Sequence, residues 1–141
     1  MLLNRNVFPI ILMLTIVCLE NERVISVVLN RKQLEAWYPD FNTTREIDLH
    51  NRNITSIEVD TFASLTNVYT LDLSLNNLTQ IDANTFESLV NLNYLDMSYN
   101  SLANISKDTF KSLNTLKQLF LLSNNLTVLN SEMLRLSFDF Y

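Results

Sequence analysis

The stretch VYTLDLSLNNL, residues 68–78, decides the fold of this chain because its pattern returns every 24 residues. Related stretches begin at residues 44, 92 and 116 and read TREIDLHNRNI, LNYLDMSYNSL and LKQLFLLSNNL. Seven positions of each repeat are expected to be apolar. They are apolar in 26 of 28 cases, with Thr44 and Ser137 as the exceptions. A fixed period of this length predicts stacked supersecondary units that share one continuous core.

Inside each stretch, apolar side chains alternate with others as they do in a short β-strand. Leu71 and Leu73 are expected to point inward, with their neighbours pointing outward. An Asn side chain at the bend after the strand can both donate and accept hydrogen bonds with buried backbone groups. This slot predicts a structural ladder of Asn76, Asn100 and Asn124. Arg52 holds the slot in the first repeat and cannot accept a hydrogen bond, so that bend must be solved differently.

The second half of each repeat carries its own pattern, DTFASL at residues 60–65, NTFESL at 84–89 and DTFKSL at 108–113. Asp or Asn before a short apolar-periodic stretch is typical of a cap or turn. We expect one helical turn, of α or 3₁₀ type, at each place. The recurring Phe62, Phe86 and Phe110 are predicted to stack as a spine under the convex side.

Taken together, these residues resemble the leucine-rich repeat consensus LxxLxLxxNxL over residues 44–136. The repeat class is similar to that of Toll-like receptor ectodomains and of chaoptin- or connectin-like adhesion proteins of arthropods. The resemblance implies an α/β leucine-rich repeat solenoid with a short parallel β-sheet on its concave face. Irregular, 3₁₀ or short helical turns are implied on the convex side.

The pattern divides the chain into three parts. Residues 1–18 are predicted to be a signal peptide, because Arg5 precedes an apolar run too short to span a bilayer; an uncleaved signal anchor is the alternative. Residues 19–43 do not fit the repeat. Their residues 24–29 predict a strand, and the segment is expected to cover the first repeat. Four repeats follow at 44–67, 68–91, 92–115 and 116–141, the last of them degenerate.

Composition and charge limit the kinds of partner, cofactor and metal site that the chain can have. The formal net charge is -5 and no basic stripe is present, which argues against a nucleic-acid partner. Glycine is absent, so no glycine-rich phosphate loop exists. Cys18 is the single cysteine, which excludes a disulfide framework and a cysteine zinc site within one chain. We expect no cofactor and no metal, although a cation between stacked carboxylates is an alternative.

Five Asn-x-Ser/Thr sequons suggest the secretory route and N-glycosylation. They predict a secreted or extracellular protein, free or associated with the cell surface, with glycans along one edge of the solenoid. The predicted acceptors are Asn42, Asn53, Asn77, Asn104 and Asn125.

Outward strand positions form columns across the predicted concave face. The central column is Asp48, Asp72, Asp96 and Phe120, and one column beside it is His50, Ser74, Ser98 and Leu122. Aromatic and acidic residues stand out on this face, because aromatic side chains bury much area at interfaces. The predicted partner contacts are Tyr69, Asp72, Tyr94, Asp96, Tyr99 and Phe120.

A solenoid presents an extended face, so the sequence predicts a recognition module that binds a protein or glycan through its concave face. Adhesion and innate immune recognition are the roles implied by the resemblance. No catalysis is expected, because no motif specifies a nucleophile and His50 stands alone. One alternative is a truncated fragment that extends the solenoid of a partner; another is a carboxylate-dependent hydrolase. Beyond the signal we expect no transmembrane segment. Self-association through the uncapped C-terminal end is a further prediction.

Overall fold

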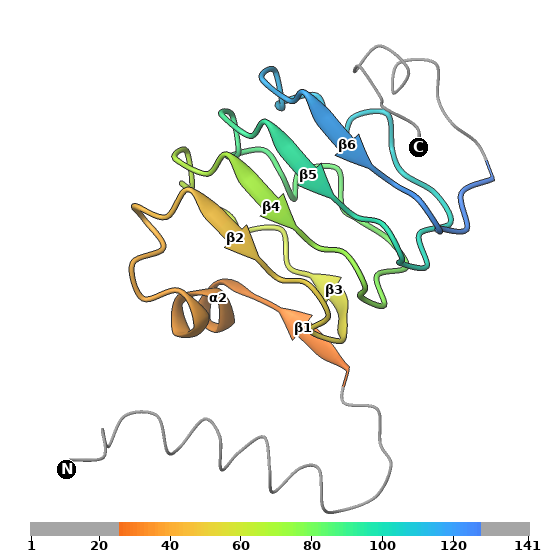
Figure 1. Ribbon diagram of the computed structural model, residues 1–141, viewed down its shortest axis with the longest axis horizontal. Coiled ribbons are helices and arrows are strands. Elements are labelled where there is room, and N and C mark those ends of the chain that lie inside the picture. Colours follow the sequence, from red (N-terminus) through yellow and green to blue (C-terminus); the bar gives the residue numbers. More distant parts are fainter. Residues whose placement is uncertain (1–25, 128–141) are drawn as a thin grey trace, which may run out of the picture.

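The structure is a computed structural model that describes residues 26–127, and its strands stack in parallel along a solenoid (Figure 1). One sheet has the strand order β2-β4-β5-β6, and a smaller sheet pairs β1 with β3. The register of the larger sheet advances by one repeat per strand, with Leu71 opposite both Ile47 and Leu95. The elements are β1 (Val27–Leu29), α2 (Arg31–Trp37), β2 (Glu46–Asp48), β3 (Ile54–Ile57), β4 (Thr70–Asp72), β5 (Tyr94–Asp96) and β6 (Gln118–Phe120).

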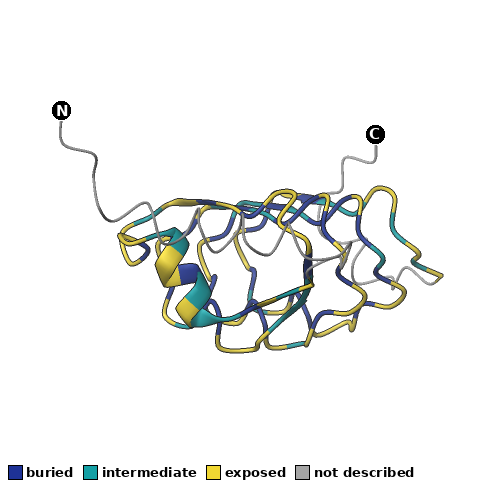
Figure 2. Ribbon diagram, turned by 90° about the horizontal axis from the view of Figure 1, so that it is seen from below, coloured by how far each residue is buried: buried dark blue, intermediate teal, exposed yellow. Residues whose placement is uncertain are grey.

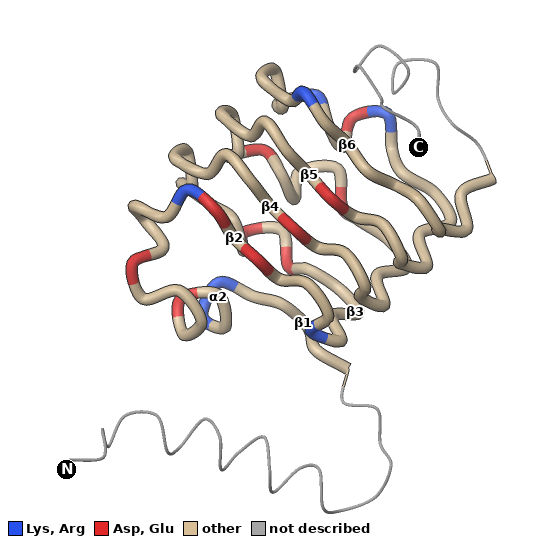
Figure 3. The backbone as a smooth tube through the Cα atoms, in the orientation of Figure 1, with Lys and Arg blue, Asp and Glu red and all other residues tan. Residues whose placement is uncertain are grey.

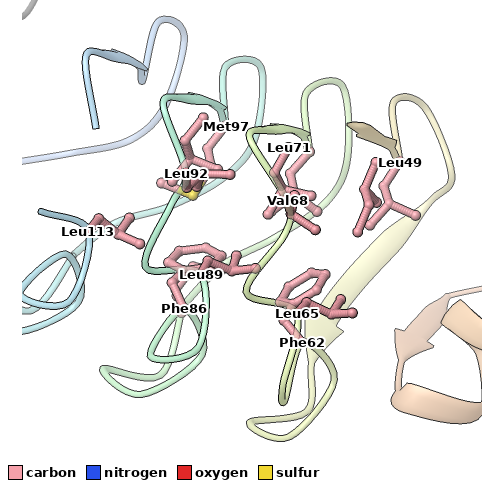
Figure 4. Packing of buried hydrophobic residues seen from close by; sticks show 14 of the residues in the cluster. Leu49, Phe62, Leu65, Val68, Leu71, Phe86, Leu89, Leu92, Met97 and Leu113 are labelled. Atoms are coloured by element: carbon pink, nitrogen blue, oxygen red, sulfur yellow. The ribbon is translucent and has the colours of Figure 1, made fainter. Parts of the chain in front are cut away.

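The core lies between the four-stranded sheet and the returning segments of the repeats. Buried and exposed residues recur at matching places in successive turns (Figure 2). Leu71 and Met97 point from the sheet into this core (Figure 4), and both are fully buried, as is Leu95. Each such side chain contributes a large part of the free energy of folding, since truncation to Ala costs about 2–5 kcal/mol.

The predicted phenylalanine spine is confirmed. The rings of Phe62 and Phe86 stack with centroids 6.2 Å apart, and those of Phe86 and Phe110 with centroids 6.4 Å apart. All three rings are buried on the returning side of the solenoid. Stacked rings at this separation add to the burial of apolar area, so the spine links three repeats into one unit.

The returning segments form tight turns where a helical turn was predicted. In the first repeat the Thr61, Ala63 and Leu65 amides donate to the carbonyls three residues earlier, at 3.1, 3.0 and 3.2 Å. These bonds come from every second amide, whereas a helix needs a bond from every successive amide. Ser64, with φ 64°, also leaves the helical region. The prediction of a helical turn was therefore wrong at these residues.

The segment before the first repeat contributes a strand and a helix to the N-terminal end. β1 pairs in parallel with β3, and the predicted strand is present from Val27; residues 24 and 25 lie outside the described range. The sequence analysis missed α2, whose first turn is capped by the Asn30 side chain accepting from the Gln33 amide at 2.9 Å. Leu34 of α2 is fully buried in the common core.

Several predictions concern residues outside 26–127. The signal peptide at 1–18, with Cys18, and most of the decayed fourth repeat belong to these parts of the chain. Within the described range, α2 has only seven residues, and none of the structure is a helix long and apolar enough to cross a membrane.

Candidate binding face

Three asparagines hold the bends where the chain leaves the sheet. The amide nitrogen of Asn76 donates to the Leu49, Leu73 and Ser74 carbonyls at 2.9, 2.9 and 3.1 Å. Its oxygen accepts from the Arg52 and Ile54 amides, both at 3.0 Å. Each such side chain therefore serves its own repeat and the repeat before it.

Asn100 and Asn124 repeat this arrangement one and two turns later. Asn100 accepts from the Leu78 amide at 3.0 Å, and Asn124 accepts from the Leu102 amide at 3.0 Å. Because the slot serves the preceding turn, the first repeat can hold Arg52 there: its bend is bonded by Asn76 of the second repeat. The Arg52 guanidinium instead lies 5.0 Å above the ring of Trp37.

The aspartate column has a structural role at the strand ends. One oxygen of Asp48, Asp72 and Asp96 accepts from the backbone amide two residues later, at 3.0, 2.8 and 2.8 Å. This is the Asx-turn geometry, which explains why Asp recurs at the slot. Only one oxygen of each carboxylate is engaged in this bond, so the other can still interact with a ligand. The red segments on β2, β4 and β5 in Figure 3 mark this acidic side of the sheet.

Tyr94 and Phe120 come together on adjacent strands. Their ring centroids are 5.2 Å apart and the rings are tilted by 40°. The Tyr94 hydroxyl lies 3.5 Å from Oδ2 of Asp96, a weak contact. Asp96 is also in register with Asp72 and with Phe120. The sheet thus places four of the predicted contact residues side by side, two aromatic and two acidic.

The environment of Tyr94 is electrostatically negative. Partial burial raises the pKa of its hydroxyl above 10.0, and the charges of Asp96 and Asp72 raise it further. The phenol is therefore neutral over the physiological range and can donate a hydrogen bond. Negative charge beside an aromatic pair favours a cationic group in a ligand.

The remaining two predicted contacts lie at opposite ends of the strands. Tyr69 precedes β4, is 41% exposed, and has the Arg45 guanidinium 5.7 Å from its ring centroid. Tyr99 follows β5 and is 50% exposed. The structure therefore does not gather all six predicted residues into one cluster.

Two residues of one predicted outward column are buried. Ser74 and Ser98 are only 7% and 5% exposed, and each closes the turn formed by the aspartate two residues earlier. His50, in the same column at the first repeat, is exposed and has Nδ1 3.1 Å from the Ser74 hydroxyl. Treating the serines as outward was wrong. In the described part of the chain, no group of three or more His, Cys, Asp or Glu side chains could hold a metal ion.

All five sequon asparagines are exposed. Three of them occupy the same repeat position, directly after the slot of the asparagine ladder, so they lie along one edge of the solenoid. These are Asn53, Asn77 and Asn125.

A family model described as "Leucine rich repeat" matches residues 42–102. The fold is that of a leucine-rich repeat solenoid. No curated protein matches its sequence significantly. Among solved structures, TLR13 in its complex with ssRNA13 has a TM-score of 0.67 and 24% identity over 78% of this chain. The leucine-rich repeat domain of APL1B has a TM-score of 0.63 and 20% identity over 76% of it. That of APL1 gives 0.54 and 24% over 72%.

The solenoid spans only a part of each of these structures, 15% of the TLR13 chain and 33% and 32% of the two APL1 chains. The shared feature is the fold, a stack of short parallel strands with few helices. Leucine-rich repeat domains of this kind are typically binding modules without enzymatic activity.

Proposed function

We propose that this leucine-rich repeat solenoid is an extracellular recognition module that binds a protein partner through the outer face of β2, β4, β5 and β6, its predicted concave face. The observation that carries the proposal is the Tyr94–Phe120 pair beside Asp72 and Asp96. Aromatic side chains with a polar rim are typical of interface hot spots. Adhesion or innate immune recognition is the role we infer for it.

A protein partner is favoured over a nucleic acid. The neighbouring TLR13 structure contains single-stranded RNA. In this chain, however, β2, β4 and β5 carry Glu46, Asp48, Asp72 and Asp96, and carboxylates repel phosphates. The basic residues Arg45 and Lys117 stand singly before two strands and do not form a stripe.

Secretion and N-glycosylation are part of the proposal. Their support is the exposure of all five sequon asparagines, since the folded chain can carry a bulky glycan only at its surface. Treatment of the chain expressed in a eukaryotic secretory host with an endoglycosidase is expected to lower its apparent mass. An unchanged mass would contradict glycosylation but would leave the binding proposal standing.

Binding is tested with the immobilised full chain and native extracellular fluid. The variant Tyr94→Ala/Phe120→Ala is expected to weaken retention of the captured protein by about 30-fold or more, because loss of a hot spot costs about 2 kcal/mol or more. The matched control, Val59→Ala/Val90→Ala, removes exposed apolar side chains from the returning segments and should bind like the wild type. Equal retention by both folded variants would refute the role of the sheet face.

A further inference from the structure

The four repeats share one unusual backbone position. Three residues after the end of β2, β4, β5 and β6, respectively, Asn51, Leu75, Tyr99 and Ser123 have φ of 53°, 55°, 55° and 54°. This is the left-handed region, which disfavours residues with a Cβ and is best tolerated by Gly, Asn and Asp. The recurrence shows that the repeat geometry imposes this conformation.

The residues that occupy this position differ in a telling way. Asn51 and Ser123 are small and polar, whereas Leu75 and Tyr99 are large and 46% and 50% exposed. Half-exposed side chains contribute little to the core, and a bulky residue gains nothing from the left-handed conformation. Leu75 and Tyr99 are therefore conformationally unfavourable at this position, and the fold itself does not require their side chains.

Together with Leu122, these exposed apolar residues lie on neighbouring turns at the strand ends, and we call the three residues the exit ridge. The Tyr99 amide donates to the Leu122 carbonyl at 2.8 Å, which places their backbones next to each other. Leu122 is 52% exposed and follows Phe120 by two residues. The ridge therefore lies next to the end of β6, close to the Tyr94–Phe120 pair.

Carboxylates lie along the inner side of the ridge. The Ser98 amide donates to Asp96 at 2.8 Å, while the Ser98 carbonyl accepts from the Leu75 amide at 3.0 Å. Asp72 holds Ser74, the residue before Leu75, in the same way. The basic residues Arg45 and Lys117 precede their strands and so lie at the opposite end. The surface at the strand exits is thus apolar with an acidic border.

On the basis of the proposed function, we infer that the exit ridge, formed by Leu75, Tyr99 and Leu122, is the anchoring surface for the partner. Charge complementarity defines the occupant: a protein segment that presents apolar side chains to the ridge and Lys or Arg to Asp72 and Asp96. Exposed apolar surface bordered by polar residues is a mark of such interaction sites.

The test uses a random dodecapeptide library displayed on phage and selected on the full-length chain expressed in bacteria, where the sequon that Tyr99→Asn creates with Asn100 and Ser101 is not glycosylated. Selected peptides are expected to be rich in Lys or Arg and in apolar residues. Their binding should fall at least ~10-fold in Leu75→Asn/Tyr99→Asn, consistent with loss of contacts worth about 1.4 kcal/mol. It should also weaken when salt is raised from about 0.1 M to about 1 M. The matched control Ser123→Asn changes the same backbone position without removing apolar surface and should bind normally.

The possible outcomes separate the two proposals. Peptides that tolerate Leu75→Asn/Tyr99→Asn but are lost in Tyr94→Ala/Phe120→Ala would overturn the ridge and leave the proposed function intact. Enrichment of acidic peptides would overturn the assigned partner chemistry. Peptides that depend on neither variant would overturn both proposals.

Thermal unfolding gives an independent readout. Because Asn tolerates the left-handed conformation, the single variants Leu75→Asn and Tyr99→Asn are expected to melt at or above the wild-type midpoint. A lower midpoint for both would show that the fold requires these side chains and would overturn the inference.

Discussion

The first and third repeats place the same groups in different surroundings. In the third repeat β5 pairs with β4 on one side and with β6 on the other, and the buried bend is held by Asn100 and by Asn124 of the next turn. In the first repeat β2 has β4 on one side and the preceding segment on the other. There a tyrosine hydroxyl takes the place of a strand: Tyr38 accepts from the Asp48 amide at 2.7 Å and donates to the Asp48 carbonyl at 2.6 Å.

The returning side of the solenoid also differs between the first repeat and the two repeats after it. The Thr61 hydroxyl donates to the Leu29 carbonyl of β1 at 3.1 Å. Thr85 and Thr109 hold the equivalent position in the next two repeats, and their buried hydroxyls have no hydrogen-bond partner among the described residues. On this side the N-terminal end supplies a hydrogen-bond acceptor, the Leu29 carbonyl, that the two later threonines lack.

That end is also held together without disulfides. Arg31 donates to the Ala63 carbonyl, and its guanidinium lies 4.2 Å above the ring of Phe41. Arg52 over Trp37 adds a second cation–π contact. Such contacts contribute about 0.5–2 kcal/mol each. Together with the buried Leu34, they fix the segment before the repeats to the solenoid.

The largest expected difference in stability between the first and third repeats concerns the position of the asparagine ladder. Asn100→Ala should lower the free energy of unfolding by about 3 kcal/mol or more, because several buried backbone groups lose their partner at about 1–3 kcal/mol each. Arg52→Ala should cost only about 0.5–2 kcal/mol, because it removes the contact with Trp37 while Asn76 still bonds the first bend. Urea unfolding followed by circular dichroism measures both. Similar losses of unfolding free energy in the two variants would mean that the first repeat also depends on the side chain at this position.

An intermediate effect is expected at the edge of β2. Tyr38→Phe should cost about 1 kcal/mol, since water can partly replace the hydroxyl beside the exposed Asp48. Hydrogen exchange of the Asp48 amide should accelerate, while exchange of the Asp96 amide, inside the sheet, should not change. Equal acceleration at both amides would contradict a local role for Tyr38.

The same residue gives a pH dependence. Burial raises the pKa of Tyr38 above 10.0, and the Asp48 charge adds to this, against the opposing hydrogen bond to Asp48 and the charge of Arg52. The folded state therefore holds this proton more tightly than the unfolded chain. Its contribution to stability is complete below pH 10 and is lost as pH rises through the raised pKa. Tyr38→Phe should flatten the fall in melting temperature above pH 10. An unchanged dependence of the melting temperature on pH would count against this role of Tyr38.

The smallest expected difference concerns the threonine position. Thr61→Val should cost about 1 kcal/mol, because the Leu29 carbonyl loses its partner. Thr85→Val should be neutral or stabilising, because it removes a buried hydroxyl that lacks a bond. Differential scanning calorimetry of the two variants provides the comparison. A destabilised Thr85→Val would show that this hydroxyl is bonded in solution, for example to water.

Much of the fold followed from the periodic slots. Leu71, Leu95 and Leu119 are buried and in register, and Tyr94 lies against Phe120, as the alternation predicts. The helix α2 was missed although Asn30 and Pro39 bracket it with ordinary start and stop signals. It buries only Leu34, so it shows little apolar periodicity.

The binding face was less accessible to sequence reasoning. Strict alternation assigns Ser74 and Ser98 to the surface, but the turn closed by the preceding Asp buries them. Leu75 and Leu122 were not among the predicted partner contacts, because neither is aromatic or charged. Only their exposure and, for Leu75, the left-handed backbone distinguish them.

The sequence by itself determined the repeat, the inward slots and the register, because a 24-residue period leaves one way to bury the same apolar positions in every turn. Tertiary structure decided the rest. It used Tyr38, Thr61 and Arg52 to complete an end that has no preceding repeat. It also imposed a left-handed residue after every strand, and so exposed Leu75 and Tyr99. These features arise from contacts between segments about 10–30 residues apart, which a local pattern does not contain.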